Sequence, residues 1–147
     1  MTAGYYFKSG GYFTSHSAFF VVQSVQEKAV FFMSESKLRT LSTDFAVVVI
    51  KLCETIKGHR SLVNQLERSG TSIGANIREA NYAHSKPDFV AKLQIALKEC
   101  YETEYWLELL VKAEIIDRDI VAGVYRQCGT IRRILIASIN TAKGNKL

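Results

Sequence analysis

The sequence predicts an all-α fold, namely an antiparallel, up-down bundle of four helices. Apolar residues recur at three- and four-residue spacing in four successive segments, which is the spacing of one helix face. The connections between these segments are short, and helices joined by short connections pack antiparallel to their neighbours. No segment after residue 42 shows the alternation of apolar and polar residues that would favour a strand.

Length and composition are those of one compact domain. The chain has 147 residues, enough to bury a core, and 48% hydrophobic with 22% charged residues argues against disorder. The net charge of +5 is compatible with nucleic acid or an acidic partner, although many soluble proteins without either carry as much. The cysteines, Cys53, Cys100 and Cys128, form no CxxC pair and lie within apolar patterns, which predicts buried, reduced thiols in a cytoplasmic protein. No apolar run approaches the ~18 to 20 residues of a membrane-spanning helix.

The first 32 residues differ from the rest of the chain. They are rich in aromatic residues, glycine and serine, carry only Lys8, Glu27 and Lys28 as formal charges, and lack helical periodicity. They also lack the basic start and the small-residue cleavage site of a signal peptide. We expect residues 1–32 to be a poorly ordered extension, or at most a weak strand or short helix, and Met33 to be the natural start of a domain over residues 33–147.

The first two helices are expected at residues 42–57 and 61–84. Ser42 or Thr43 can cap the first helix, and Gly58 follows its end. Its apolar face holds residues at helical spacing: Leu41, Phe45, Val48, Val49, Leu52 and Ile56. The second helix has a stripe of apolar and small residues that runs straight past two glycines: Leu62, Leu66, Ser69, Ile73, Ile77 and Ala80.

The segment RSGTSIGANIREA (residues 68–80) raises the question of a phosphate-binding loop. Such a loop needs GxxxxGK[ST], or GxGxxG between a strand and a helix, and neither pattern is present. Two glycines inside a helix cost roughly 2 kcal/mol against alanine. We therefore expect a compensating close approach of another helix at Gly70 and Gly74. One turn later, Asn76 and Glu79 are candidates for polar ties across the bundle.

The third and fourth helices are expected at residues 86–112 and 118–142. Ser85, Pro87 and Asp88 form the capping signature that starts the third. Asp117 can cap the fourth, which is expected to fray near Gly144. Each helix carries one apolar stripe: Phe89, Leu93, Ala96, Leu97, Cys100, Leu107 and Leu110 in the third, and Ile120, Val124, Cys128, Ile131, Leu135 and Ile139 in the fourth.

Three aromatic residues of the third helix, Tyr101, Tyr105 and Trp106, are more than one narrow core stripe can hide. They fit either a wide core or a subunit interface, where tyrosine and tryptophan are enriched.

Catalytic and metal sites find little support in the sequence. Carboxylates on the second and third helices could suggest a metal centre: Glu79, Glu99, Glu102, Glu104 and Glu108. A di-metal site of that kind needs Glu-x-x-His pairs on facing helices, and the chain has none. No histidine and acid are placed to activate a serine. We expect no metal, no cofactor and no enzyme activity, with Glu99 and Glu102 paired instead with Lys98 or with arginines of other helices.

Basic residues are distributed unevenly along the chain. Residues 57–92 and residues 114–147 each hold six basic and three acidic residues, whereas residues 93–113 hold two basic and four acidic ones. The second and fourth helices are therefore expected to present positive faces. Their arginines are candidates for contacts with nucleic-acid phosphates: Arg60, Arg68, Arg78, Arg118, Arg126, Arg132 and Arg133. A solvated face, or ion pairs between subunits, explains the same charges equally well.

Two blocks of the sequence resemble a known family. QLERSGTSIGANIREA (residues 65–80) and SKPDFVAKLQIALKECYETEYWLELL (residues 85–110) are similar to the four-helix-bundle proteins encoded by intervening sequences within bacterial 23S ribosomal RNA genes. The accessory variability determinant proteins of diversity-generating retroelements share that fold. The similarity spans about residues 36–143, and the first 32 residues have no counterpart in it.

The resemblance implies a left-handed bundle that assembles as a ring-like homopentamer with a positive surface. It brings no catalytic residues to carry over. For the retroelement relatives, the implied role is binding nucleic acid and a reverse transcriptase. Residues in the two matching blocks are expected to have structural and interface roles: Gly70, Gly74, Asn76, Glu79, Glu99, Glu102, Tyr105 and Trp106.

The expected function is accordingly that of a non-enzymatic, oligomeric bundle that associates with structured RNA, or with RNA and DNA, through the second and fourth helices. The alternative is a protein-interaction scaffold whose ring binds a protein partner such as a reverse transcriptase. No membrane partner is expected.

Overall fold

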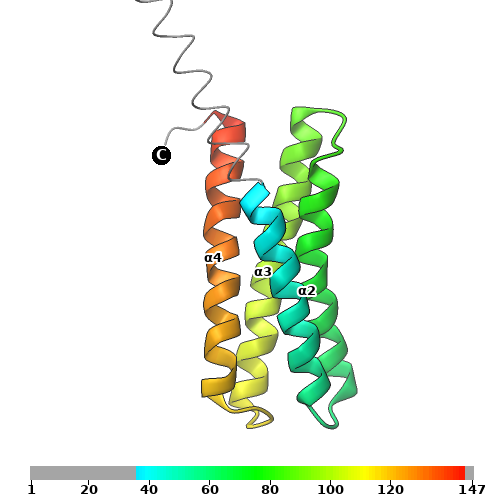
Figure 1. The fold of residues 1–147 in the computed structure, drawn as a ribbon, viewed down its shortest axis with the longest axis vertical. Coiled ribbons are helices and arrows are strands. Elements are labelled where there is room, and N and C mark those ends of the chain that lie inside the picture. Colours follow the sequence, from blue (N-terminus) through cyan, green and yellow to red (C-terminus); the bar gives the residue numbers. More distant parts are fainter. Residues whose placement is uncertain (1–35, 145–147) are drawn as a thin grey trace, which may run out of the picture. The chain divides into compact units, whose positions relative to one another are not determined.

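Four helices joined by short connections make up the part of the chain that the computed structural model describes, residues 36–144 (Figure 1). The first helix covers residues 36–55 of that part, and α2 (Arg60–Ala80), α3 (Lys86–Lys112) and α4 (Arg118–Lys143) follow it. The all-α four-helix bundle predicted from the sequence is confirmed. The predicted extension at residues 1–32 and the predicted start at Met33 lie outside the described residues.

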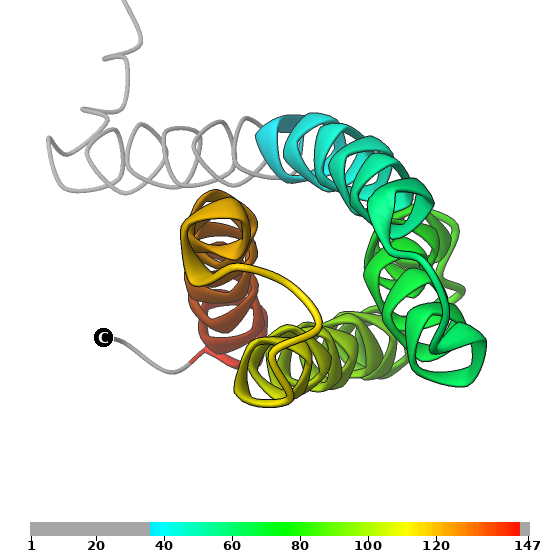
Figure 2. The same ribbon diagram turned by 90° about the horizontal axis from the view of Figure 1, so that it is seen from below.

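The helices stand at the four corners of a square when the bundle is seen end-on (Figure 2). α3 packs against both α2 and α4. The first helix closes the square between α2 and α4, so that α2 and α4 lie diagonally across the bundle. Within residues 36–144, none of the helices combines the length and the apolar character needed to cross a membrane.

The start predicted for the first helix is wrong. Neither Ser42 nor Thr43 is a cap, because the chain is already helical at residue 36. Ser42 is fully buried, and its hydroxyl donates to the carbonyl oxygen of Arg39 at 3.0 Å. A serine that satisfies its hydroxyl on its own helix can lie in the interior. Leu38, 1% exposed, extends the apolar face by one turn toward the N-terminus.

α2 ends four residues earlier than the predicted end at residue 84. The apolar stripe stops at Ala80, and the next large residue, Tyr82, is 83% exposed, so further turns would bury nothing. The helix begins after His59, which has left-handed backbone angles and makes no side-chain cap. Gly58, at φ 75°, precedes it in the turn that follows the first helix.

The boundaries of α3 and α4 agree with the prediction to within one residue. Ser85 Oγ accepts a hydrogen bond from the Asp88 backbone N–H at 3.3 Å. Asp117 Oδ1 accepts one from the Asp119 backbone N–H at 2.8 Å. Gly144, at φ 76°, ends α4 in the left-handed conformation that favours glycine.

The core contains a small polar contact between α2 and α3. Ser69 and Thr103 are both fully buried, and the Thr103 hydroxyl lies 3.0 Å from the Ser69 hydroxyl and 2.7 Å from the Glu99 carbonyl oxygen. The Ser69 hydroxyl in turn donates to the Leu66 carbonyl oxygen. Both hydroxyls therefore have hydrogen-bond partners, as buried polar groups require.

The two helix-interior glycines of α2 are in different surroundings. A Cβ atom at Gly70 would lie 2.8 Å from Cγ1 and 3.0 Å from Cγ2 of Val49 in the first helix. At Gly74 the nearest atoms would be the backbone and hydroxyl oxygens of Ser42, at 3.5 Å. The predicted close approach of another helix is therefore confirmed at Gly70, whereas Gly74 has room for a methyl group.

Candidate nucleic-acid interface

The seven candidate arginines do not form one surface. Arg60, Arg68 and Arg78 lie on α2, the other four lie on α4, and these helices are at opposite corners of the bundle (Figure 2). The structure thus separates the two positive helices that the charge distribution predicted.

Arg68 is engaged within the chain. Its Nη2 lies 3.0 Å from Glu102 Oε1 on α3, and its Nε donates to Gln65 Oε1 at 3.3 Å. The same Glu102 oxygen accepts from Trp106 Nε1 at 3.2 Å. The expected pairing of Glu102 with an arginine is confirmed. The carboxylate of Glu102 therefore offsets the positive charge of Arg68.

A second ion pair ties α2 to α3. Lys92 Nζ donates to Glu79 Oε2, and this hydrogen bond, together with the nearby negative charge, raises the pKa of Lys92. The polar tie expected at Glu79 is confirmed. The one expected at Asn76 is wrong, because the Asn76 amide donates to the Ser72 carbonyl oxygen of its own helix at 2.9 Å.

Glu99 does not have the partner predicted for it. Its Oε2 atom is buried and accepts no hydrogen bond from residues 36–144. Desolvation, and then the neighbouring charge of Glu102, raise the pKa of this carboxyl against the opposing effects of Arg68 and Lys98. Arg68 forms its ion pair with Glu102, and the Glu99 carboxylate lies near this pair without joining it.

Arg78, on α2, faces the first helix. Arg78 Nη2 donates to Thr43 Oγ1 at 3.3 Å. Arg78 and Thr43 line a shallow groove of about 320 Å³. Arg39, Thr40 and Asp44 of the first helix line it as well. Arg39 was not among the candidates, because its helix was expected to start after it.

On α4, Arg132 is the arginine held most firmly in the fold. Its Nε lies 3.0 Å from Oε1 of Glu104, a residue only 8% exposed, and its guanidinium carbon lies 5.5 Å from the centre of the Tyr101 ring. The hydrogen bond with Glu104 is the largest effect that raises the pKa of Arg132. These contacts make Arg132 part of the packing between α3 and α4.

The other α4 arginines have no carboxylate partner within residues 36–144. Arg126 and Arg133 are exposed, and Arg133 Nη2 donates only to the Thr130 hydroxyl, at 3.0 Å. Arg118 stands at the start of the helix and is also exposed. Since no ion pair holds them, their guanidinium groups are available to a ligand.

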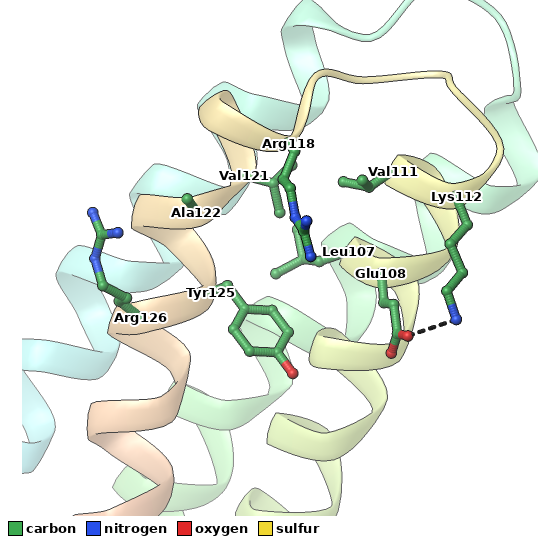
Figure 3. Close-up of a pocket in the computed structure, with 9 residues that line it drawn as sticks. All are labelled: Leu107, Glu108, Val111, Lys112, Arg118, Val121, Ala122, Tyr125 and Arg126. Carbon is green, nitrogen blue, oxygen red and sulfur yellow. Dashed lines mark ion pairs between the residues drawn. The ribbon is translucent and has the colours of Figure 1, made fainter.

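A groove of about 500 Å³ lies between α3 and α4 beside these arginines (Figure 3). The side chains of Leu107, Val111 and Val121 form its apolar lining, and the Tyr125 ring stands at its mouth. The Arg118 guanidinium points into the space between the two helices, and Arg126 points away on the other side of α4. At its far edge, Lys112 Nζ pairs with Glu108 Oε1 at 2.8 Å.

Arg126 also borders a second groove, of about 430 Å³, between α4 and the first helix. Leu41, Val48 and Gly123 line it together with Gln127. Arg126 therefore projects from a ridge that separates two open grooves.

The cysteines are buried thiols, as predicted. Burial is the main cause that raises the pKa of Cys53 to about 11. The hydrogen bond with Cys128, followed by burial, raises the pKa of Cys100. Thiols held protonated in this way are poor nucleophiles and poor metal ligands. No cluster of three or more histidine, cysteine, aspartate or glutamate side chains suited to a metal occurs in residues 36–144.

The model of the 23S rRNA-intervening sequence protein family matches residues 34–137 of the chain. The chain belongs to this family. Among solved structures, it is similar to a protein of unknown function from the S23 ribosomal protein family of Bacteroides thetaiotaomicron VPI-5482, with 42% sequence identity and a TM-score of 0.69. The match covers 73% of this chain and 98% of that one. A comparison with curated proteins gave no match. The resemblance to the intervening-sequence family seen in the two sequence blocks is confirmed.

Proposed function

We propose that this member of the 23S rRNA-intervening sequence family is a non-enzymatic protein that binds structured RNA through phosphate contacts along α4. The observation that carries the proposal is the set of arginines Arg118, Arg126 and Arg133, which are exposed and have no carboxylate partner within the described residues. Arg118 and Arg133 are 15 residues apart on one helix, about 22 Å along its axis. Unpaired positive charges distributed over this length of helix can each meet a phosphate of a nucleic acid that runs along α4.

Replacing Arg126 and Arg133 together by glutamine is expected to weaken binding of a fluorescein-labelled RNA hairpin evenly across sequences. Each phosphate contact contributes about 0.7 to 0.9 to the slope of log K against log salt, so the double variant should lose about 1.5 from that slope. Fluorescence anisotropy between roughly 50 and 200 mM salt measures both quantities.

The matched control is Arg68→Gln, which removes an equally positive residue that is already paired with Glu102. It should leave the slope unchanged. If the slope of the Arg126 and Arg133 variant equals that of the wild type, the contacts lie elsewhere. If the wild-type protein binds no hairpin even at low salt, the proposal of RNA binding fails.

We further propose that copies of the chain associate through the outer face of α3, as the resemblance to a pentameric ring implies. Ile95 is 41% exposed and Tyr105 is 55% exposed, so both lie on the outer surface of this helix, about 15 Å apart along its axis. The Tyr105 ring packs edge-on against Trp106, with ring centres 4.9 Å apart, which holds it in place. A fixed, exposed aromatic residue is a common anchor of subunit interfaces. A protein partner such as a reverse transcriptase would bind the assembled ring.

Tyr105→Ala is expected to raise the dissociation constant of the assembly about tenfold or more, because interface anchors of this kind contribute at least about 1.4 kcal/mol. Light scattering over a concentration series would show a multiple of 16.5 kDa for the wild type and a shift toward that mass for the variant. Tyr82→Ala, which removes an 83% exposed tyrosine outside this face, is the control. A wild-type protein that is monomeric at micromolar concentration contradicts the proposal.

A further inference from the structure

We propose that the groove between α3 and α4 binds a single unpaired nucleobase of the bound RNA, and that this base stacks on Tyr125. The inference rests on the proposed RNA binding and adds to it a preference for loops or bulges over fully paired helices.

The groove has the size and the lining that a base requires. Its volume is about 500 Å³, within the range of roughly 300 to 1,000 Å³ of pockets that hold drug-sized ligands, so there is room for one base. Leu107, Val111, Val121 and Ala122 supply apolar surface, and none of them competes for the polar edge of a base. Leu107 and Val121 are buried at the floor of the groove, whereas Val111 and Ala122 are partly exposed, so a flat ring entering from the solvent would cover carbon atoms of these two residues.

Tyr125 supplies a stacking surface at the mouth of the groove. The residue is 42% exposed, and its ring stands in the space between α3 and α4 rather than against the helix it belongs to (Figure 3). Sequence-specific recognition of RNA most often works by stacking unpaired bases on such exposed aromatic side chains.

The charges around the groove fit the phosphates on either side of the base. Lys112 is neutralised by Glu108, so the net positive charge comes from Arg118 and Arg126. Arg118 points into the groove and Arg126 points outward across α4 (Figure 3). They are eight residues apart, about 12 Å along the helix axis, with Tyr125 between them. Arg118 can thus meet the backbone beside a base held at Tyr125, and Arg126 can meet it where the RNA continues across α4.

The occupant follows from this combination. A purely apolar partner, such as a helix of another protein, would have to bury or displace the unpaired Arg118 guanidinium, which is costly. A fully paired RNA duplex presents phosphates but keeps its bases stacked inside, so it would leave the apolar groove open to water. An unpaired nucleotide satisfies both the apolar lining and the charge.

The test uses the full chain and three labelled RNA hairpins that differ at one position: an unpaired adenosine bulge, an abasic nucleotide in the same bulge, and no bulge. Stacking contributes about 1 to 3 kcal/mol per base, so the bulged hairpin should bind about 5- to 150-fold more tightly than the abasic one. Tyr125→Ala should abolish this ratio, whereas Tyr125→Phe should preserve it. Tyr82→Ala, in the turn between α2 and α3, should also preserve it, because that turn lies at the other end of the bundle from the turn between α3 and α4 (Figure 1).

The salt slope distinguishes this contact from the phosphate contacts. Tyr125→Ala removes no charge, so its slope of log K against log salt should equal that of the wild type. Equal affinity of the wild-type protein for all three hairpins overturns the inference but leaves phosphate binding intact. Binding of none of them, even at roughly 50 mM salt, overturns the proposed function and the inference with it. An assembly that dissociates on Tyr125→Ala, with the affinity ratio unchanged, identifies the groove as an interface between copies and overturns the inference.

Discussion

Gly70→Ala is expected to lower the free energy of unfolding by about 2 kcal/mol, although alanine is the better helix former. The new Cβ would lie 2.8 Å from Val49 Cγ1, closer than two carbon atoms can stand without one of them moving. Val49 is fully buried and β-branched, so it has no other rotamer to adopt easily. Overpacking of this kind destabilises a protein by up to about 3 kcal/mol. The higher helix propensity of alanine offsets about 1 kcal/mol of this, which leaves about 2 kcal/mol. Urea denaturation measures the difference.

Gly74→Ala is the matched control, because it makes the same chemical change one turn along the same buried face. There the new Cβ would meet Ser42 at 3.5 Å, an ordinary contact distance. This variant should therefore be as stable as the wild type or up to about 1 kcal/mol more stable. Combining Gly70→Ala with Val49→Ala, which removes both clashing methyl groups, should cost less than the sum of the two single changes. Equal stability of the Gly70 and Gly74 variants would contradict the explanation.

The boundaries that could be predicted from the sequence are those set by local chemistry. Ser85 and Asp117 mark the starts of α3 and α4 because each accepts a hydrogen bond from a backbone N–H two or three residues later. Ser42 looks the same in the sequence, yet its hydroxyl bonds back to its own helix at a fully buried position. Whether a serine caps a helix or lies inside it depended on Leu38, one turn earlier, which was left out of the expected apolar face.

The pairing of charges could be predicted only in part. Each helix was assigned its charges correctly, but the partner of a charge depends on how the helices face one another. Arg68 and Arg132 are both arginines on predicted positive helices, and both turn out to be paired, with Glu102 and Glu104. Glu99, one turn from either carboxylate, was expected to be paired and is not. Such partners are set by the packing of α3 between α2 and α4, which periodicity does not define.

Tyr125, to which we assign a role in RNA binding, was not among the candidates, because only the apolar stripe and the arginines of the fourth helix were considered. A signal was present in the sequence. Tyr125 lies outside the stripe of α4 that contains Val124 and Cys128, and Arg126 directly follows it. An aromatic residue beside the core stripe and next to an arginine is a feature that sequence reasoning can seek on the third and fourth helices of similar chains.

Arg132→Ala is expected to lower the free energy of unfolding by about 3 kcal/mol at neutral pH, the lower end of the range for breaking a buried ion pair. The lower end applies because the Arg132 side chain is 29% exposed. The cost arises from Glu104, which is 8% exposed and would be left charged without its partner. Arg133→Ala is the neighbouring control and should change stability by no more than about 0.5 kcal/mol, since its guanidinium bonds only to Thr130.

Two further measurements separate the loss of the pair from the loss of arginine packing. The first measurement is the comparison with Arg133→Ala given above, which removes an arginine that holds no carboxylate. The double variant Arg132→Met with Glu104→Leu should be near wild-type stability, since apolar residues of similar size replace both buried charges. RNA binding by this double variant should keep the wild-type salt slope, because Arg132 is engaged inside the fold and Arg126 and Arg133 remain. A reduced slope would mean that Arg132 contacts the nucleic acid. A double variant as unstable as Arg132→Ala would mean that the lost packing of Arg132, and not the unpaired charge of Glu104, causes the deficit.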